Sequence, residues 1–477
     1  MVFSSLFFLY AFFPICMLLY VLARTTPARN VVLLIFSLLF YAWGEPIYML
    51  LLIGMAFFDW LFTLQMPKGH AKLWLVLACV VNLGILGVFK YCNFIADNIS
   101  AIFGADSPIP TIALPIGISF YTFQLLSYVI DVYRGEVAPQ KRFATVLLYA
   151  SLFHQCIAGP IVRYADVENE LTARRVNAAD VSEGIRRFCV GLGKKVIIAN
   201  TCGNLADTLI AGGDGSITLA SVTAAPASAL WVSMLAYTLQ IYFDFSAYSD
   251  MAIGMGRMIG FHYLENFNYP YIAASVKDFW RRWHMSLSTF FRDYVYIPLG
   301  GSRRSLGRTI FNMLVVWALT GLWHGASWNF VLWGLWFFVF LAAETLFLGK
   351  ALKKAPIVGV LYTLIVVYFG WVLFRFQDAE VMLAVLRGMF GVGGNPWASF
   401  ETTLLIKNHA FFLPAAMVGA TPVFAVLSRR WAALGKQNGL AATSYAVAQL
   451  VWPFVLLFVS TILLVGNSYN PFLYFQF

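Results

Sequence analysis

Long apolar runs separated by short polar stretches follow one another along nearly the whole chain. Candidate membrane helices lie at about residues 3–21, 30–43, 46–65, 73–89, 112–132, 143–158, 196–211, 228–243, 246–261, 309–323, 327–348, 356–374, 411–427 and 446–465. Several are too short to cross a hydrocarbon layer of ~30 Å, which takes a helix of ~20 residues. The pattern therefore predicts an all-α polytopic membrane protein with about eleven full spans plus re-entrant segments, whose backbone must be covered by protein.

The composition supports a membrane protein. The chain has 477 residues, of which 61% are hydrophobic and 11% charged, whereas soluble domains carry about 25% charged residues. No linker or internal repeat divides it, so we expect one membrane-embedded domain over residues 1–477. The six cysteines are scattered and form no Cys-x-x-Cys pair, which favours buried thiols over a disulfide framework or a metal site.

The net charge of +10 is concentrated in two stretches. Residues 134–195 contain ten Lys and Arg, and residues 277–308 contain seven. The positive-inside rule places both stretches in the cytoplasm, with the N-terminus and the loops at 97–110 and 212–226 outside. We expect contact with membrane lipid and none with nucleic acid.

One histidine lies deep in an apolar run. His324 follows the run 309–323, and Arg308, the last basic residue before it, is sixteen residues away. At ~1.5 Å per residue, a helix carries His324 up to ~24 Å into the membrane. An ionisable group at that depth is a functional-site hypothesis by default, and imidazole can accept a proton near neutral pH. The alternative is a core histidine between helices that Gly321 and Gly325 allow to approach closely.

A second candidate site lies in the basic residues 278–288. His284 and Arg281 are three residues apart and would share one face of a helix. On that face Arg281 and Arg282 can hold an anionic donor, with His284 behind them. The alternative is an amphipathic helix on the membrane surface, anchored by its aromatic residues.

Polar residues also recur on one predicted helical face. Tyr121, Gln124, Tyr128 and Asp131 follow a 3-4-3 spacing, so they share a face that must look inward in a bilayer, toward a cavity or toward partner helices.

Two further carboxylates, Asp244 and Asp250, lie in an apolar setting. They fit either a proton relay or a structural role, such as pairing with Arg257 or capping a broken helix. The structural role is favoured because buried acids are normally paired. The sequence contains no P-loop, no Gly-x-Ser-x-Gly and no His-x-x-x-His pair, so nucleotide hydrolysis, α/β-hydrolase chemistry and metal-assisted chemistry lack support.

Five motifs resemble the membrane-bound O-acyltransferase (MBOAT) superfamily. They are LPIGISFYTF at 114–123, YFDFS at 242–246, ENFN at 265–268, FWRRWH at 279–284 and LWHG at 322–325. The start of the chain at 1–5 and its end at 471–477 are also similar to the branch that contains the membrane subunit of bacterial alginate O-acetylation. The resemblance covers essentially the whole chain.

This resemblance implies a ring of tilted helices around a tunnel in a bacterial inner membrane. His324 matches the catalytic histidine of the family, and His284 matches the second histidine. The expected tunnel-lining residues are Tyr121, Gln124, Asp244, Asn266 and Trp323, and the expected donor-binding residues are Arg281, Arg282, Arg303 and Arg304. No bound cofactor is implied. The donor is acetyl-CoA or a carrier-protein thioester, whose acetyl group passes to a periplasmic or extracellular acetyltransferase partner that esterifies an alginate-like or other exopolysaccharide. Related members act on peptidoglycan, cellulose or teichoic acid.

The chemistry of acyl transfer agrees with these assignments. It needs a base for the attacking hydroxyl and donors for the developing oxyanion; Asn329 or the N–H of Trp323 or Trp328 could supply the donor. Two other classes of function remain open. One is a proton-coupled transporter or flippase that uses Asp131, Asp244 and Asp250, and the other is a scaffold in which neither histidine matters.

Overall fold

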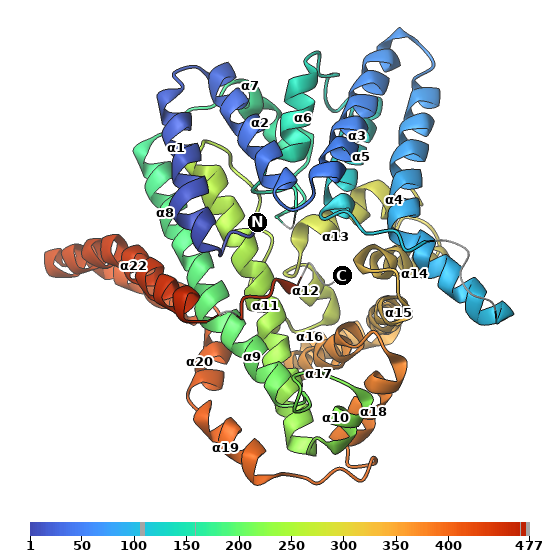
Figure 1. The fold of residues 1–477 in the computed structure, drawn as a ribbon, viewed down its shortest axis with the longest axis vertical. Helices are drawn as coiled ribbons and strands as arrows, with labels where there is room; N and C mark the ends of the chain where they lie inside the picture. Colours follow the sequence, from blue (N-terminus) through green and yellow to red (C-terminus); the bar gives the residue numbers. More distant parts are fainter. Residues whose placement is uncertain (105–109, 158, 468, 474–477) are drawn as a thin grey trace. The chain divides into compact units, whose positions relative to one another are not determined.

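The structure of the chain, a computed structural model, describes residues 1–104, 110–157, 159–467 and 469–473. Over these residues it contains helices and no strand (Figure 1), which confirms the all-α prediction. The chain groups into two compact units that alternate in sequence. The first comprises Met1–Phe188 and Tyr248–Glu265, and the second Cys189–Ala247 and Asn266–Phe477. A single functional domain over residues 1–477 stays a prediction.

The first unit is built around α5, which is buried on almost every side. Its helices are α1 (Phe13–Leu22), α2 (Thr26–Ala42), α3 (Pro46–Gln65), α4 (Ala71–Phe103), α5 (Ile118–Arg134), α6 (Phe143–Ser151), α7 (Tyr164–Thr172) and most of α8 (Ala178–Gly193). Helix α5 is flanked by Gly117 and Gly135, which both have positive φ angles, a conformation that glycine adopts without strain. A Cβ on Gly117 would also lie 2.6 Å from the carbonyl oxygen of Cys156, so this turn admits no larger residue.

The second unit holds the longer C-terminal part of the chain. Its helices are α9 (Asn200–Thr208), α10 (Leu219–Ala224), α11 (Ala227–Met258, whose last turns belong to the first unit), α12 (Val276–Trp280), α13 (Met285–Phe291), α14 (Leu306–His324), α15 (Trp328–Ala343), α16 (Gly349–Lys354), α17 (Pro356–Arg375), α18 (Ala379–Met389), α19 (Phe400–Asn408), α20 (Phe412–Gly419), α21 (Val423–Gly435) and α22 (Gly439–Gly466). Its core is rich in aromatic rings, including Trp280, Trp333 and Trp371.

Short helical turns join or extend these helices. They are η1 (Phe8–Phe12), η2 (Met66–Lys68), η3 (Lys194–Ala199), η4 (Pro270–Ile272), η5 (Arg292–Tyr296) and η6 (Glu344–Leu348).

Several of the helices are long and apolar enough to cross a membrane. Within the described residues these are Pro46–Lys68, Ala71–Phe103, Leu306–His324, Trp328–Lys354, Pro356–Arg375 and Gly439–Gly466, which makes six, or seven if α20 and α21, bent by 65°, form one span. The chain is therefore a polytopic membrane protein, whereas the count of about eleven spans stays a prediction.

The structure corrects some predicted boundaries. The two runs predicted at 228–243 and 246–261 lie on one helix, α11, which ends at Met258. Asp244 and Phe245 between the runs are neither proline nor glycine and do not break it. The apolar run 143–158 is helical only to Ser151, and the loop that follows it contains Pro160. The basic residues 278–288 are not one amphipathic helix, because α12 ends at Trp280 and α13 begins at Met285.

Candidate active site

Helix α14 ends at His324, as the apolar run predicted, and two glycines set its position against α15. A Cβ on Gly321 would lie 2.4 Å from the carbonyl oxygen of Phe330, and a Cβ on Gly334 would lie 2.4 Å from that of Trp317. These distances are too short for any real side chain, so the two helices pack backbone to backbone at this level. The close packing that was the alternative explanation for Gly321 is therefore present, and it fixes where His324 lies.

Aromatic rings enclose the imidazole of His324. The side chain is buried, and its ring centroid lies 4.8 Å from that of Trp333, 5.0 Å from Trp323 and 5.2 Å from Phe374, in each case edge to face. Edge-to-face packing restrains both the position and the tilt of a ring. His324 therefore has a fixed orientation in an apolar setting.

His324 also faces a narrow cavity in the second unit. The cavity is lined by Ile241, Asp244, Phe245, Trp283, His324, Trp333, Trp371, Phe374, Phe472 and Leu473. Its volume is about 30 Å³, which is room for about two water molecules. The wall is almost wholly apolar, with His324 and Asp244 as its two titratable groups.

Asp244, the second titratable group in this wall, has a cationic partner. Lys195 lies 2.7 Å from its carboxylate, and both side chains are buried. The backbone N–H of Leu473 donates to the other carboxylate oxygen at 2.9 Å, and the Lys195 ammonium also donates to the carbonyl of Pro471. The predicted pairing of Asp244 is therefore confirmed, but the partner is Lys195 and not Arg257. Through these bonds the segment 471–473 is tied into the cavity wall; residues 474–477 of the C-terminal motif lie outside the described residues.

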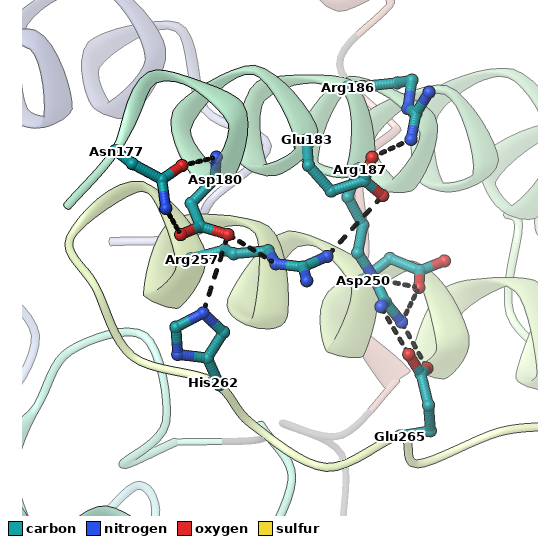
Figure 2. A network of polar contacts seen from close by, with 9 residues as sticks. All are labelled: Asn177, Asp180, Glu183, Arg186, Arg187, Asp250, Arg257, His262 and Glu265. Atoms are coloured by element: carbon teal, nitrogen blue, oxygen red, sulfur yellow. Dashed lines mark hydrogen bonds and ion pairs between the residues drawn. The ribbon is translucent and has the colours of Figure 1, made fainter. Parts of the chain in front are cut away.

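Asp250 belongs to a separate network in the first unit (Figure 2). Arg187 donates to its carboxylate at 3.0 Å and also pairs with Glu265. Burial alone would lower the pKa of Arg187, but the hydrogen bonds and charges of these two carboxylates raise it overall, so the guanidinium remains charged. Arg257 pairs with Asp180 in the same network, at 3.6 Å. Arg257, the partner that the sequence suggested, is therefore not the partner of Asp250 either. A pattern along the chain does not show which distant cation folds against a carboxylate.

The second histidine is held by the segment that contains the ENFN motif. His284 is buried, and its Nδ1 lies 3.2 Å from the Oδ1 atom of Asn266. Its backbone is left-handed, with φ +44° and ψ +54°, so it does not continue α12. Arg281 is exposed, and the predicted helical face shared by His284 and Arg281 is absent. The i, i+3 argument failed because it assumed a helix through this turn.

Asn266 and Trp323 both contact the histidines, and their predicted place in the lining of a tunnel stays a prediction. Asn266 binds His284 directly, and the ring of Trp323 lies 5.9 Å from that of His284 and 5.0 Å from that of His324. Trp323 is thus the ring that both histidines contact.

Sequence analysis missed Trp333. This residue is fully buried, lines the cavity beside His324, and its indole N–H has no acceptor within the described part of the chain. Asn329, which sequence analysis named as an oxyanion donor, instead uses its amide to bind the carbonyls of Leu373 and Phe374. Trp328 is largely exposed. The chain has fifteen tryptophans, and Trp283 and Trp371 also line the cavity, so the contact of its ring with His324 at 4.8 Å is what singles out Trp333.

The predicted donor-binding arginines fall into two groups. Arg304 and Arg308 line a hollow of about 500 Å³ together with Pro298, Leu299, Gly300 and Ser305, and Arg303 is exposed beside them in sequence. Arg281 and Arg282 do not line this hollow. Arg282 is paired with Asp278 at 3.0 Å, so Arg281 is the more available of the two for an anion.

The remaining predicted residues belong to the first unit. Tyr121, Gln124, Tyr128 and Asp131 are all buried on α5, which confirms that their common face looks inward. The hydroxyl of Tyr128 lies 3.3 Å from that of Thr63 and accepts the N–H of Gln140, which is interhelical packing. Whether Tyr121 and Gln124 line a tunnel stays a prediction. The described residues contain no cluster of His, Cys, Asp or Glu that could hold a metal ion.

The chain belongs to the membrane-bound O-acyltransferase family. The family's model, described as "MBOAT, membrane-bound O-acyltransferase family", matches residues 140–386, and this range contains both His284 and His324. The resemblance inferred from the five motifs is therefore confirmed, and the chain is an acyltransferase.

Individual relatives differ in the polymer that their names mention. The chain is 39% identical to the probable alginate O-acetylase AlgI of Pseudomonas putida over 100% of both chains. It is 33% identical to the peptidoglycan O-acetyltransferase of Helicobacter pylori, over 83% of this chain and 80% of the relative. It is 27% identical to the teichoic acid D-alanyltransferase of Bacillus subtilis, over 54% of this chain and 68% of the relative.

Proposed function

We propose that this protein takes an acetyl group from a cytoplasmic thioester and passes it across the bacterial inner membrane for O-acetylation of an extracellular polysaccharide. The observation that carries the proposal is the setting of His324, an oriented imidazole in the wall of a narrow apolar cavity within the part of the chain that matches the family. The full-length likeness to the alginate O-acetylases supports a polysaccharide as the final acceptor.

In the proposed reaction, the oxygen of an acceptor hydroxyl attacks the thioester carbonyl while His324 takes the hydroxyl proton. The carbon–sulfur bond then breaks, and the proton passes from His324 to the departing thiolate. The products are an acetyl ester and a free thiol. The N–H of Trp333 donates to the carbonyl oxygen as negative charge develops on it. The narrow apolar wall excludes bulk water, which would otherwise hydrolyse the thioester.

The proposed donor is acetyl-CoA or a carrier-protein thioester. Both carry phosphate, which is attracted to arginines such as the exposed Arg281 and the pair Arg304 and Arg308 in the hollow. An acetyltransferase outside the membrane is the proposed partner that delivers the ester to the polysaccharide. A proton-coupled transporter is not proposed, since Asp244 and Asp250 each pair with a cation.

Deletion of the gene followed by complementation tests the acceptor. We expect the deletion strain to lose alkali-labile acetate from its exopolysaccharide, to retain it on peptidoglycan, and to regain it with the wild-type gene. Loss of acetate from peptidoglycan alone would move the proposal to that polymer. Unchanged ester content in every envelope polymer would refute the proposed function.

A further inference from the structure

The tautomer of His284 can be deduced from the hydrogen bonds of Asn266. The Oδ1 atom of Asn266 accepts the backbone N–H of Ser286 at 3.2 Å and the Ser286 hydroxyl at 2.9 Å. A backbone N–H can only donate, so the amide atom that faces it must be the oxygen and not the nitrogen. The same oxygen lies 3.2 Å from Nδ1 of His284. The hydroxyl of Ser286 also lies 3.4 Å from Nδ1, but its proton goes to Oδ1 of Asn266. Nδ1 therefore carries a proton of its own, and the uncharged imidazole keeps its lone pair on Nε2.

The backbone around His284 holds this arrangement in place. Asn266 accepts the N–H of Met285 through its carbonyl, and Asn268 donates its N–H to the carbonyl of Arg282. Residues 266–268 and 282–286 are thus fastened by main-chain and side-chain bonds together. His284 has a left-handed backbone, a conformation that is uncommon outside glycine and that persists where the surroundings impose it.

The other ring nitrogen of His284, Nε2, is not used in these hydrogen bonds. It is buried and has no hydrogen-bond partner within the described residues. Buried polar atoms are almost always paired, so an exception calls for an explanation. Aromatic rings surround the imidazole, with Phe245 at 4.7 Å and Trp323 at 5.9 Å between ring centroids. Phe245 also lines the cavity at His324, which connects His284 to the site already described.

The pKa of His284 distinguishes two roles for Nε2, that of a general base and that of a hydrogen-bond acceptor. Burial lowers the pKa of His284 to about 3, and no carboxylate or cation of the described chain contributes to this shift. Asp244 of α11 and Lys195 of η3 pair with each other, and the ring of Trp323 contacts both His284 and His324. A base works best with a pKa near the working pH. His284 is therefore poorly suited to carry a proton at neutral pH, but it stays uncharged and able to accept a hydrogen bond.

We propose that Asn266 is a positioning residue that locks His284 in the Nδ1–H tautomer, so that Nε2 accepts a hydrogen bond from the bound substrate. This inference rests on the proposed acyl transfer and divides the work between the two histidines: His324 takes the proton, and His284 orients the substrate. The hydrogen-bond donor on the substrate is either the attacking hydroxyl or an amide N–H on the arm of the thioester. Both present the same chemistry to Nε2.

Inverted membrane vesicles from cells that express the full chain provide the test. They expose the cytoplasmic face to [14C]acetyl-CoA, and the ester-bound label released by mild alkali gives kcat and KM. Asn266→Asp keeps an acceptor for Nδ1–H and adds a negative charge, which favours the imidazolium and raises the pKa of His284. We expect the acid limb of its pH–rate profile to move to higher pH. Asn395→Asp, an identical change at a site that binds the carbonyls of Thr223 and Ala225, should leave the profile in place.

Asn266→Leu and His284→Phe remove the acceptor for Nδ1–H and the imidazole itself. A neutral hydrogen bond is worth about 0.5–1.5 kcal/mol, so we expect kcat/KM to fall by roughly 2- to 12-fold in each variant. An increase in KM for acetyl-CoA would identify the amide N–H of the thioester arm as the hydrogen-bond donor. A fall in kcat at saturating acetyl-CoA would identify the attacking hydroxyl. Asn266→Asp should recover most of the rate above pH 7.

Direct observation of the tautomer keeps the proposal testable even if the variants fold poorly. In protein labelled with ¹⁵N-histidine, the signals missing from His284→Phe belong to His284, and we expect a protonated Nδ1 and an unprotonated Nε2. A protonated Nε2, or a pH–rate profile of Asn266→Asp that coincides with that of wild type, would overturn the inference about His284. The proposed function would still stand in that case, provided that the wild-type protein transfers acetyl. Absence of transfer by wild type would refute both.

Discussion

Replacing Trp333 with Phe tests whether its N–H stabilises the oxyanion. The substitution keeps an aromatic ring beside His324 and removes a buried N–H that has no acceptor within the described residues. Removal of one oxyanion donor typically lowers kcat by about 10²–10³, or ~2.7–4 kcal/mol. We therefore expect Trp333→Phe to lose at least ~10²-fold in kcat with little change in KM. The smaller ring also leaves a void, and we expect a stability cost of about 1–2 kcal/mol.

Trp336→Phe is the matched control, because Trp336 lies one turn further along α15. Its N–H donates to the carbonyl of Val366 at 2.9 Å, and it does not line the cavity. Its loss removes one neutral hydrogen bond, because the carbonyl of Val366 keeps its bond within α17; this costs about 0.5–1.5 kcal/mol of stability and should leave turnover per folded molecule unchanged. The assay is vesicle acetyl transfer normalised to folded protein, with thermal unfolding measured in detergent. If Trp333→Phe turns over as fast as Trp336→Phe, Trp333 is a packing residue and the oxyanion donor lies elsewhere.

Three further predictions concern the ion pair, the donor and the topology. Lys195→Met leaves the Asp244 carboxylate buried without its cation and should cost about 3–5 kcal/mol of stability, seen as a large fall in Tm in detergent. Adding Asp244→Leu should restore most of that stability. If Lys195→Met alone is as stable as wild type, the structural role of the pair is contradicted. Arg281→Glu should weaken binding of a non-hydrolysable acetyl-CoA analogue in a salt-dependent manner, while His324→Ala should not; the opposite outcome would exchange the two roles. A cysteine placed at Arg303, in a variant that lacks the six native cysteines, should resist impermeant maleimide added from outside, and rapid labelling would reverse the predicted orientation.

The features that sequence analysis predicted correctly are those that repeat locally. Apolar runs predicted the all-α fold and the helix that ends at His324, because a bilayer demands continuous apolar surface. A 3-4-3 spacing predicted the buried face of α5, since that spacing is a property of the helix itself. The same reasoning failed at His284, where two short helices meet at a left-handed residue and i, i+3 neighbours no longer share a face.

The features it missed depend on contacts between distant parts of the chain. Lys195 and Asp244 are 49 residues apart in sequence, and nothing local to either one identifies the other. Trp333 is distinguished by its contact with His324 in the cavity wall, which depends on how α15 packs against α14 and α17. The position of Asn266 in ENFN is visible in the sequence, but its bond to His284 appears only when residues 266–268 fold against 282–286.

The central claim is that His324 takes the proton in acyl transfer, and one measurement tests it most directly. Inverted vesicles that contain wild type or His324→Gln, at equal amounts of folded protein, receive [14C]acetyl-CoA, and the alkali-labile label is counted over time. Glutamine keeps a polar side chain of similar size and cannot take up a proton near neutral pH. We expect the variant to bind the donor as wild type does and to transfer at least ~10²-fold more slowly, within the range of general base catalysis. Transfer by His324→Gln at the wild-type rate would contradict the account.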